Sequence, residues 1–339
     1  TRFSAEEKAE ILDHIELTRR RSRWSLWRIL RVLGLAKSTW CAWKERQRRG
    51  ELEDRKPRSV NLDALLPEEE TAIVEYALIH PKDGYRRLAY MMLDEDVAYC
   101  SPSSVYNVLA ARDLLCRWKP SRPGGAPIER PLCPHQRWHT DIMYLWVAGR
   151  WYFFVGIIDG FSRYLIHWEL LTSMRADDVS LVVQKALEKV PGVMPEIVSD
   201  NGSQYTSRDF KALIKQFHLH HIQIRIQHPE SNGIVERLHR SLREGLSDQE
   251  MEDLSHAREI IGKWVAYYNN ERLHAGIMYL RPRDYYLGHQ EALLEERRMK
   301  LQKARARRRI LNLQRRELWQ VSEEENHTNL KIEKSPNSC

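Results

Sequence analysis

The sequence predicts an α/β domain built on a mixed five-stranded sheet with flanking helices, preceded by all-α segments of the helix-turn-helix type. Apolar residues recur at helical spacing up to about residue 115, whereas alternation and short apolar runs typical of strands follow residue 135. A stretch containing Pro and Gly, residues 119–134, separates the two patterns and is expected to be a linker. The chain has 339 residues, 42% of them hydrophobic, enough for two or three domains. Its five cysteines are scattered without a Cys-x-x-Cys pair, which argues against a disulfide scaffold and a zinc ribbon.

A first helix-turn-helix domain is predicted at residues 1–55. Ser4 followed by Glu7 is a capping box, which marks the start of a helix. Gly34 then separates two short helices, and the second of them is expected to contact DNA. The alternative is a plain helical hairpin whose tryptophans form the core. The polar DNA-contact candidates on the second helix are Lys37, Ser38 and Thr39.

A second helix-turn-helix domain is predicted at residues 56–118, with residues 50–70 as a charged linker ahead of its helices. Ser101 is placed to cap a helix whose first position is Pro102, where proline is well tolerated. This helix, residues 101–112, is expected to enter a DNA groove. The DNA-contact candidates here are Arg86, Arg87, Ser103 and Ser104.

Residues 135–290 carry the strand signals. Three consecutive strands are followed by a helix capped near Asp177, and then strands alternate with helices. This order, β-β-β-α-β-α-β-α, is that of the ribonuclease H-like fold. The quoted segments are the strands "WHTDIMYLWV", "WYFFVGIID", "SRYLIHWEL", "EIVSD" and "HIQIRI", and the helices "ADDVSLVVQKALEKV", "SRDFKALIKQF" and "IVERLHRSLREGL".

Three carboxylates in this domain are candidates for catalysis and metal binding. Asp141 lies inside the first strand, Asp200 ends the fourth, and Glu236 lies in the last helix. In this topology the first and fourth strands are neighbours, so Asp141 and Asp200 would repel each other unless a cation lies between them. Oxygen ligands of this kind select Mg²⁺ or Mn²⁺. Two such ions can activate a nucleophile and stabilise the leaving oxygen of a phosphodiester.

Two blocks of positive charge dominate the net charge of +7. Residues 19–49 contain eleven Lys or Arg and one acid, Glu45, and residues 297–316 contain ten and no acid. Such blocks favour a polyanion as partner, most often nucleic acid. The alternative for both is a solvated helix face. Residues 291–339 are expected to form a basic helical tail, which would lie along a DNA backbone, dock on a partner subunit or stay unstructured.

The motifs and their spacing resemble those of the bacterial insertion-sequence DDE transposases of the copy-out–paste-in family, which have a retroviral integrase-like core. Thirty-five residues separate Asp200 from Glu236, and fifty-eight separate Asp141 from Asp200. Arg243 stands seven residues past Glu236, where this group typically carries Lys or Arg. One departure is Arg272-Leu273-His274, where the family commonly has Arg-Pro-His. The similar segments are "WHTDIMYL", "GIIDGFSRYLIHW", "VSDNGSQYTS", "HPESNGIVERLHRSLREGL", "YYNNERLHAGIMYLRP" and "GYRRLAYMML…SPSSVYNVL".

The resemblance implies a DNA transposase that cleaves the 3′ ends of its element and transfers them to a target. It implies two Mg²⁺ ions, replaceable by Mn²⁺, held by the three carboxylates. The expected partners are double-stranded DNA, as terminal inverted repeats and target, and at least one further copy of the chain. No apolar run suggests a membrane span, and a bacterial cytoplasmic, nucleoid-associated location is expected. The DNA-contact candidates in the core are His228, Asn232, Arg240 and Arg243.

Three alternatives remain open from the sequence. A retroelement integrase has the same chemistry, although no His-His-Cys-Cys zinc module precedes this core. A DNA-binding regulator with the same fold and no catalysis is the second, and the intact set of three acids counts against it. A ribonuclease H is the third, and it explains neither the helix-turn-helix segments nor the spacing of the acids.

Overall fold

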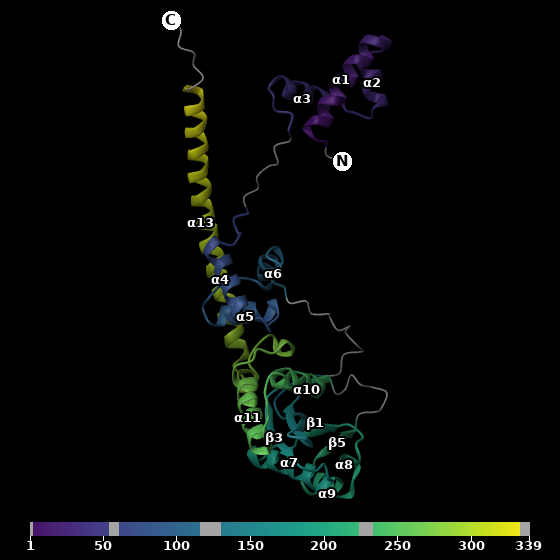
Figure 1. The fold of residues 1–339 in the computed structure, drawn as a ribbon, viewed down its shortest axis with the longest axis vertical. Helices are drawn as coiled ribbons and strands as arrows, with labels where there is room; N and C mark the ends of the chain where they lie inside the picture. The colour runs from purple at the N-terminus through teal and green to yellow at the C-terminus, as the bar shows by residue number, and fades with distance from the viewer. Residues whose placement is uncertain (1–2, 54–60, 116–129, 224–232, 333–339) are drawn as a thin grey trace. The chain divides into compact units, whose positions relative to one another are not determined.

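The computed structural model describes residues 3–53, 61–115, 130–223 and 233–332, with side chains described up to residue 317. The chain divides into two compact units, Thr1–Asn61 and Leu62–Cys339. Figure 1 shows the elements of each unit, and they are taken here one unit at a time.

The first unit is a three-helix unit of α1 (Ala5–Ser22), α2 (Leu26–Val32) and α3 (Lys37–Arg48). The predicted capping box is present at the start of α1, where the Ser4 hydroxyl accepts from the Glu7 N–H. Gly34 separates α2 from α3 with a φ of 65°, which glycine adopts without steric cost. The helices that the sequence predicts in this region are therefore present. Their core is formed by Ile15, Ile29 and Leu30, with Ile11, Leu26, Leu35 and Trp40 packed against it.

The second unit begins with a helical group of α4 (Pro67–Ile79), α5 (Tyr85–Asp94) and α6 (Pro102–Ala111), packed on a common core. The Ser101 hydroxyl caps α6 by accepting from the Ser104 N–H, as predicted. The expected linker over residues 50–70 is wrong from Pro67 onward, because α4 starts there. Pro at the first helical position and the acids after it suit a helix N-terminus, so a charged Pro-containing stretch was no sign of a linker here.

The predicted five-stranded mixed sheet is confirmed, in the order β3-β2-β1-β4-β5. Strand β1 pairs antiparallel with β2, and β2 pairs antiparallel with β3. Strand β4 runs parallel to β1, and β5 runs parallel to β4. The strands are β1 (Arg137–Val147), β2 (Arg150–Asp159), β3 (Leu165–Leu171), β4 (Glu196–Ser199) and β5 (His220–Gln223).

Helices cover both faces of the sheet, each over its own core. On one face α10 (Gly233–Leu246) and α11 (Leu254–Asn270) bury Met143 and Phe154. On the other face α7 (Ala176–Lys189), the short α8 (Ser203–Thr206) and α9 (Arg208–Gln216) bury Trp138 and Ile157. The predicted cap near Asp177 is displaced, because Arg175 is the N-cap of α7 and Asp177 lies in its first turn. There the carboxylate favours the helix through its dipole rather than as a cap.

The chain ends in a short 3₁₀ turn, η2 (Ala275–Ile277), then α12 (Pro282–Tyr286) and the long α13 (Gln290–Ile332). The predicted helical tail is therefore a helix of 43 residues. It lies beside α4 and α5 (Figure 1), and Arg297 and Arg308 bond to residues of this helical group. Within the described residues, no helix is both long and apolar enough to span a membrane.

Candidate active site

The register of the sheet aligns Asp141 with Asp200. The parallel ladder between β1 and β4 ends at His139 and Val198, and each aspartate lies two residues further along the chain, Asp141 within β1 and Asp200 just past the end of β4. At Asp200 the chain leaves the sheet in a tight turn, in which its Oδ1 accepts from the Gly202 N–H at 2.9 Å. A Cβ at Gly202 would lie only 3.0 Å from that oxygen, so glycine gives the turn the room it needs.

Helix α10 carries Glu236 to the same side of the sheet as Asp141. Its buried residues Val235 and Leu238 pack in the core that also contains Met143 of β1. Glu236 lies on the exposed side of this helix and borders a cavity of about 400 Å³ together with Asp141. The residues lining the cavity are Asp141, Ile142, Glu236, His239, Arg240, Arg243 and Glu244.

Asp141 is under electrostatic stress in the protein without a ligand. Burial raises the pKa of its carboxyl to about 6, and the negative charges of Asp200 and Glu236 add to the rise. A hydrogen bond from the Ile142 N–H, at 2.8 Å, and the positive charge of Arg243 act in the opposite direction. The carboxylates are therefore close enough to destabilise one another, and a cation among them would relieve this.

His239 is a site residue that the sequence analysis missed. Its Nδ1 lies 3.7 Å from Oδ2 of Asp141, and the ring is buried, with no hydrogen-bond partner at Nε2 in the described structure. Burial, and then the charge of Arg243, lower the pKa of His239 to about 4, so the imidazole is neutral at physiological pH. The signal that could have found it is its spacing of three residues from Glu236, which places both on adjoining faces of one helix.

The donor set suits a hard divalent cation, although the described residues include no group of three His, Cys, Asp or Glu side chains close enough to hold a metal ion. The site offers carboxylate oxygens, which Mg²⁺ prefers, and these oxygens repel one another. The three acids predicted from the sequence thus gather around one region rather than in a ready-made coordination shell. By contrast Asp159, at the end of β2, is fully buried and accepts from the N–H groups of His135 and Ser162.

Family models described as "Integrase core domain" match residues 131–229 and, in a second model, residues 218–282. The two matches together span residues 131–282, and this part of the chain, which is similar to an integrase core domain, is called the integrase core below. The predicted resemblance to bacterial insertion-sequence transposases is confirmed at this level. The integrase core accounts for the sheet, for α10 and for the segment that follows α11.

Relatives of the integrase core include insertion-sequence transposases. The "Transposase for insertion sequence element IS904" of Lactococcus lactis is 27% identical over 191 residues, which are 52% of this chain and 75% of the relative. The "Transposase InsF for insertion sequence IS3fB" of Escherichia coli is 28% identical over 228 residues, covering 61% and 74%. Among solved structures, the HTLV-2 integrase catalytic core domain in complex with magnesium is 17% identical, with a TM-score of 0.39, covering 46% of this chain and 99% of that one.

The DNA-contact candidates of the integrase core lie in two places. Arg240 and Arg243 line the cavity beside Asp141. His228 and Asn232 lie outside the described residues.

The candidates on the helical groups differ in how free they are. Lys37, Ser38, Arg86 and Ser103 are exposed, and Thr39 is half-buried. Arg87 is half-buried in an ion pair with Asp83, and Ser104 is held in the cap of α6 by Ser101. The sequence analysis missed Tyr106 and Asn107, which are exposed three and four residues after Ser103 on the same side of α6.

Proposed function

We propose that the protein is a DNA transposase that binds the ends of an insertion sequence and catalyses Mg²⁺-dependent 3′-end cleavage and strand transfer. The observation that carries this proposal is the alignment of Asp141 with Asp200 across β1 and β4, with Glu236 on the same cavity as Asp141. The insertion-sequence transposases among the relatives support the choice of substrate. On this proposal the substrates are the terminal inverted repeats and a target duplex.

Asp141, Asp200 and Glu236 would hold two Mg²⁺ ions, for which Mn²⁺ can substitute. When bound, such ions supply an activated nucleophile and a stabilised leaving oxygen at the scissile phosphodiester. His239 would keep the Asp141 carboxylate oriented by presenting a neutral N–H at its edge, because the ring is buried and uncharged. Arg240 and Arg243 would hold DNA phosphates at the cavity, a contact that positions the duplex without reading its sequence.

The helical groups would recognise the element ends. Helices α3 and α6 each follow a turn after another helix and present exposed polar residues, as recognition helices do. On α6 the exposed side carries Ser103, Tyr106 and Asn107, and asparagine pairs well with adenine in the major groove. At least two copies of the chain would act together, because both ends of the element have to be joined to one target.

The test is cleavage of a plasmid that carries the candidate element ends, with Mg²⁺ and a target plasmid. Asp141→Asn, Asp200→Asn and Glu236→Gln each remove a metal-binding charge and keep the shape of the side chain. We expect each to reduce strand cleavage by at least about 10³-fold, with binding to the ends retained. The matched control is Asp177→Asn, an exposed carboxylate in the first turn of α7 on the opposite face of the sheet.

The outcomes separate the remaining functions. If any of the three variants cleaves nearly as well as the natural protein, that carboxylate does not have the catalytic role proposed for it. If the natural protein binds the ends tightly and never cleaves them with Mg²⁺ or Mn²⁺, the silent regulator replaces the transposase. Cleavage confined to the RNA strand of RNA–DNA hybrids would replace it with a ribonuclease H.

A further inference from the structure

Helix α13 packs along the α4–α6 group through a stripe of residues at helical spacing. Its most buried side chains are Arg297, Ala304, Arg308 and Asn312, separated by seven, four and four residues. Three of these four are polar. All three bond to residues that precede the sheet in sequence, and Arg297 also bonds to the segment that follows α11. The stripe is therefore held by directed bonds rather than by apolar area alone.

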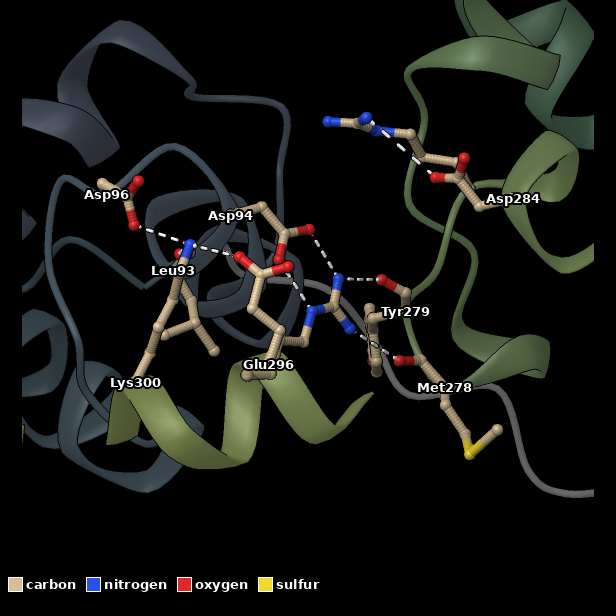
Figure 2. A network of polar contacts seen from close by, with 10 residues as sticks. Leu93, Asp94, Asp96, Met278, Tyr279, Asp284, Glu296 and Lys300 are labelled. Atoms are coloured by element: carbon tan, nitrogen blue, oxygen red, sulfur yellow. Dashed lines mark hydrogen bonds and ion pairs between the residues drawn. The ribbon is translucent and has the colours of Figure 1, made fainter. Parts of the chain in front are cut away.

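Arg297 is the most heavily bonded residue of the stripe, and it is 5% exposed. Its Nε and Nη2 donate to both carboxylate oxygens of Asp94, at 2.7 and 2.6 Å, at the end of α5. Its Nη1 and Nη2 donate to the carbonyls of Met278 and Tyr279, at 3.2 and 2.7 Å, in the segment that closes the integrase core. Figure 2 shows Asp94 on one side of this network of bonds and Met278 and Tyr279 on the other.

The same contact fixes an unusual backbone. Met278 and Tyr279 both have positive φ, of 57° and 56°, which costs energy for residues other than glycine. Tyr279 stacks on Tyr90 of α5 with ring centroids 4.9 Å apart, and the Arg297 guanidinium lies 4.8 Å from the Tyr90 ring. The strained turn thus lies where α5, the core segment and α13 meet.

Further anchors extend along α13. Lys300 bonds to Asp96 at 2.6 Å and to the Leu93 carbonyl at 3.3 Å (Figure 2). Arg308 bonds to Glu69 of α4 at 2.7 and 3.0 Å, and Asn312 donates to the carbonyls of Leu62 and Ala64 at 3.0 Å each. The helix therefore binds the α4–α6 group and the segment leading into it over sixteen residues, from Arg297 to Asn312.

We propose that α13 is a strut that fixes the α4–α6 group relative to the integrase core, with Arg297 as the positioning residue where the three segments meet. This inference rests on the proposed function for its consequence. If α6 holds DNA at one point and the carboxylates cleave at another, the strut sets the length of duplex between them. The C-terminal helix then selects ends by spacing and reads no base itself.

The first test uses the protein alone, so it does not depend on transposition. Spin labels at Ser103→Cys on α6 and Asp177→Cys on α7, both exposed, report the distance between the helical group and the core in a background with the natural cysteines replaced. We expect a narrow distance distribution in the full chain and a broad one in Arg297→Ala. Asp94→Asn is the gentler second variant, should the alanine variant fail to fold. Arg298→Ala is the matched control, because Arg298 is exposed and, among the described residues, pairs with Glu295 of its own helix.

The second test measures cleavage of ends lengthened by about half a helical turn, 5 base pairs, between the α6 footprint and the cut. The natural protein and Arg298→Ala should prefer the natural spacing by at least about tenfold, since misplacing a reacting group by ångströms costs this much or more. In Arg297→Ala and Asp94→Asn this ratio should fall towards one while affinity for the ends stays within about twofold.

The two tests can overturn separate parts of the proposal. A distance distribution as narrow in both variants as in the natural protein overturns the strut. A spacing preference unchanged in both variants overturns its role in selecting ends. A natural protein that never cleaves overturns the proposed function, and the distance measurement still decides whether α13 is a strut.

Discussion

The two basic blocks of this chain have similar composition and different surroundings. In residues 19–49 the cations lie almost entirely on the surface of the first unit, and Arg28 and Arg31 are stacked over exposed Trp24 and Trp27. In residues 297–316 two cations, Arg297 and Arg308, are buried. The remaining cations of this block that bond to residues of the helical group or the segment leading into it are Lys300, Arg309 and Arg315.

The difference teaches that a run of cations in a sequence does not identify its partner. Ten Lys or Arg with no acid among them look like a DNA-binding stripe when read locally. Half of them instead meet acids that lie more than two hundred residues earlier in the chain, from Asp63 to Asp96. A buried Arg–carboxylate pair contributes to the specificity of packing. Removing one partner destabilises the fold, because the other charge then stays buried without compensation. An exposed cation is available to a polyanion.

The largest effect should come from removing α13. Ending the chain after Gln290 removes the partners of Asp94 and Glu69, and we expect the midpoint for unfolding of α4–α6 to fall by well over about 10 °C. The sheet should remain folded. Deleting residues 1–61 should leave the melting of the rest unchanged, because these residues form a separate compact unit. Circular dichroism melts combined with hydrogen exchange measure the effect of each deletion. If the unfolding transition of α4–α6 does not shift when α13 is removed, the two basic blocks do not differ in their contribution to the fold.

Single substitutions sharpen the same contrast. Arg308→Ala leaves Glu69 without its charged partner in a largely buried position and should destabilise the protein by about 3–5 kcal/mol. The neighbouring Arg307 is exposed, so Arg307→Ala should change the free energy of unfolding by less than about 0.5 kcal/mol. Urea unfolding of the two variants gives the comparison. Equal values would mean that burial does not distinguish the cations of α13.

Sequence reasoning reached the sheet and the two aspartates because both depend on local patterns. Alternation and turn residues predict each strand, and the topology then makes β1 and β4 neighbours, which the register confirms. The role of the three acids remains a prediction. The start of α4 was not predicted because its first turn has the composition of a linker. His239 was not identified as a site residue because one buried His on a helix is common.

The partners of α13 were out of reach for a different reason. Nothing near Arg297 in sequence indicates Asp94, and the carbonyls of Met278 and Tyr279 accept hydrogen bonds whatever their side chains are. Long-range pairing of this kind appears only in the folded chain. Arg87 and Ser104 are a different case, because the residues that engage them, Asp83 and Ser101, lie only four and three positions earlier in the chain.

Asp141 is a third case for the comparison, a half-buried carboxylate that, among the described residues, forms no ion pair with a Lys or Arg. Its pKa of about 6 lies above the value in the unfolded chain, so the native state binds the proton more tightly. The contribution of Asp141 to the free energy of unfolding is therefore most favourable below about pH 4. It falls as the pH rises towards 6 and stays reduced above that pH. In EDTA, Asp141→Asn should stabilise the protein on the order of 2 kcal/mol at pH 7.5 and hardly at all at pH 4. Thermal melts across this range test it, and Mg²⁺ should reduce the difference between the two proteins.

The smallest effect concerns the cations that remain exposed in each block. Each contacted phosphate adds about 0.9 to the slope of log affinity against log salt, so replacing two cations lowers the slope by at most about 1.8. We expect Arg20→Gln with Arg21→Gln to approach this limit on a duplex of random sequence. Lys303→Gln with Arg307→Gln, exposed one turn apart on α13, should lower the slope less, because the acids bound along the helix reduce the attraction of the tail for a polyanion. Equal losses of slope would show that the tail binds DNA as well as the first block does, despite its internal ion pairs.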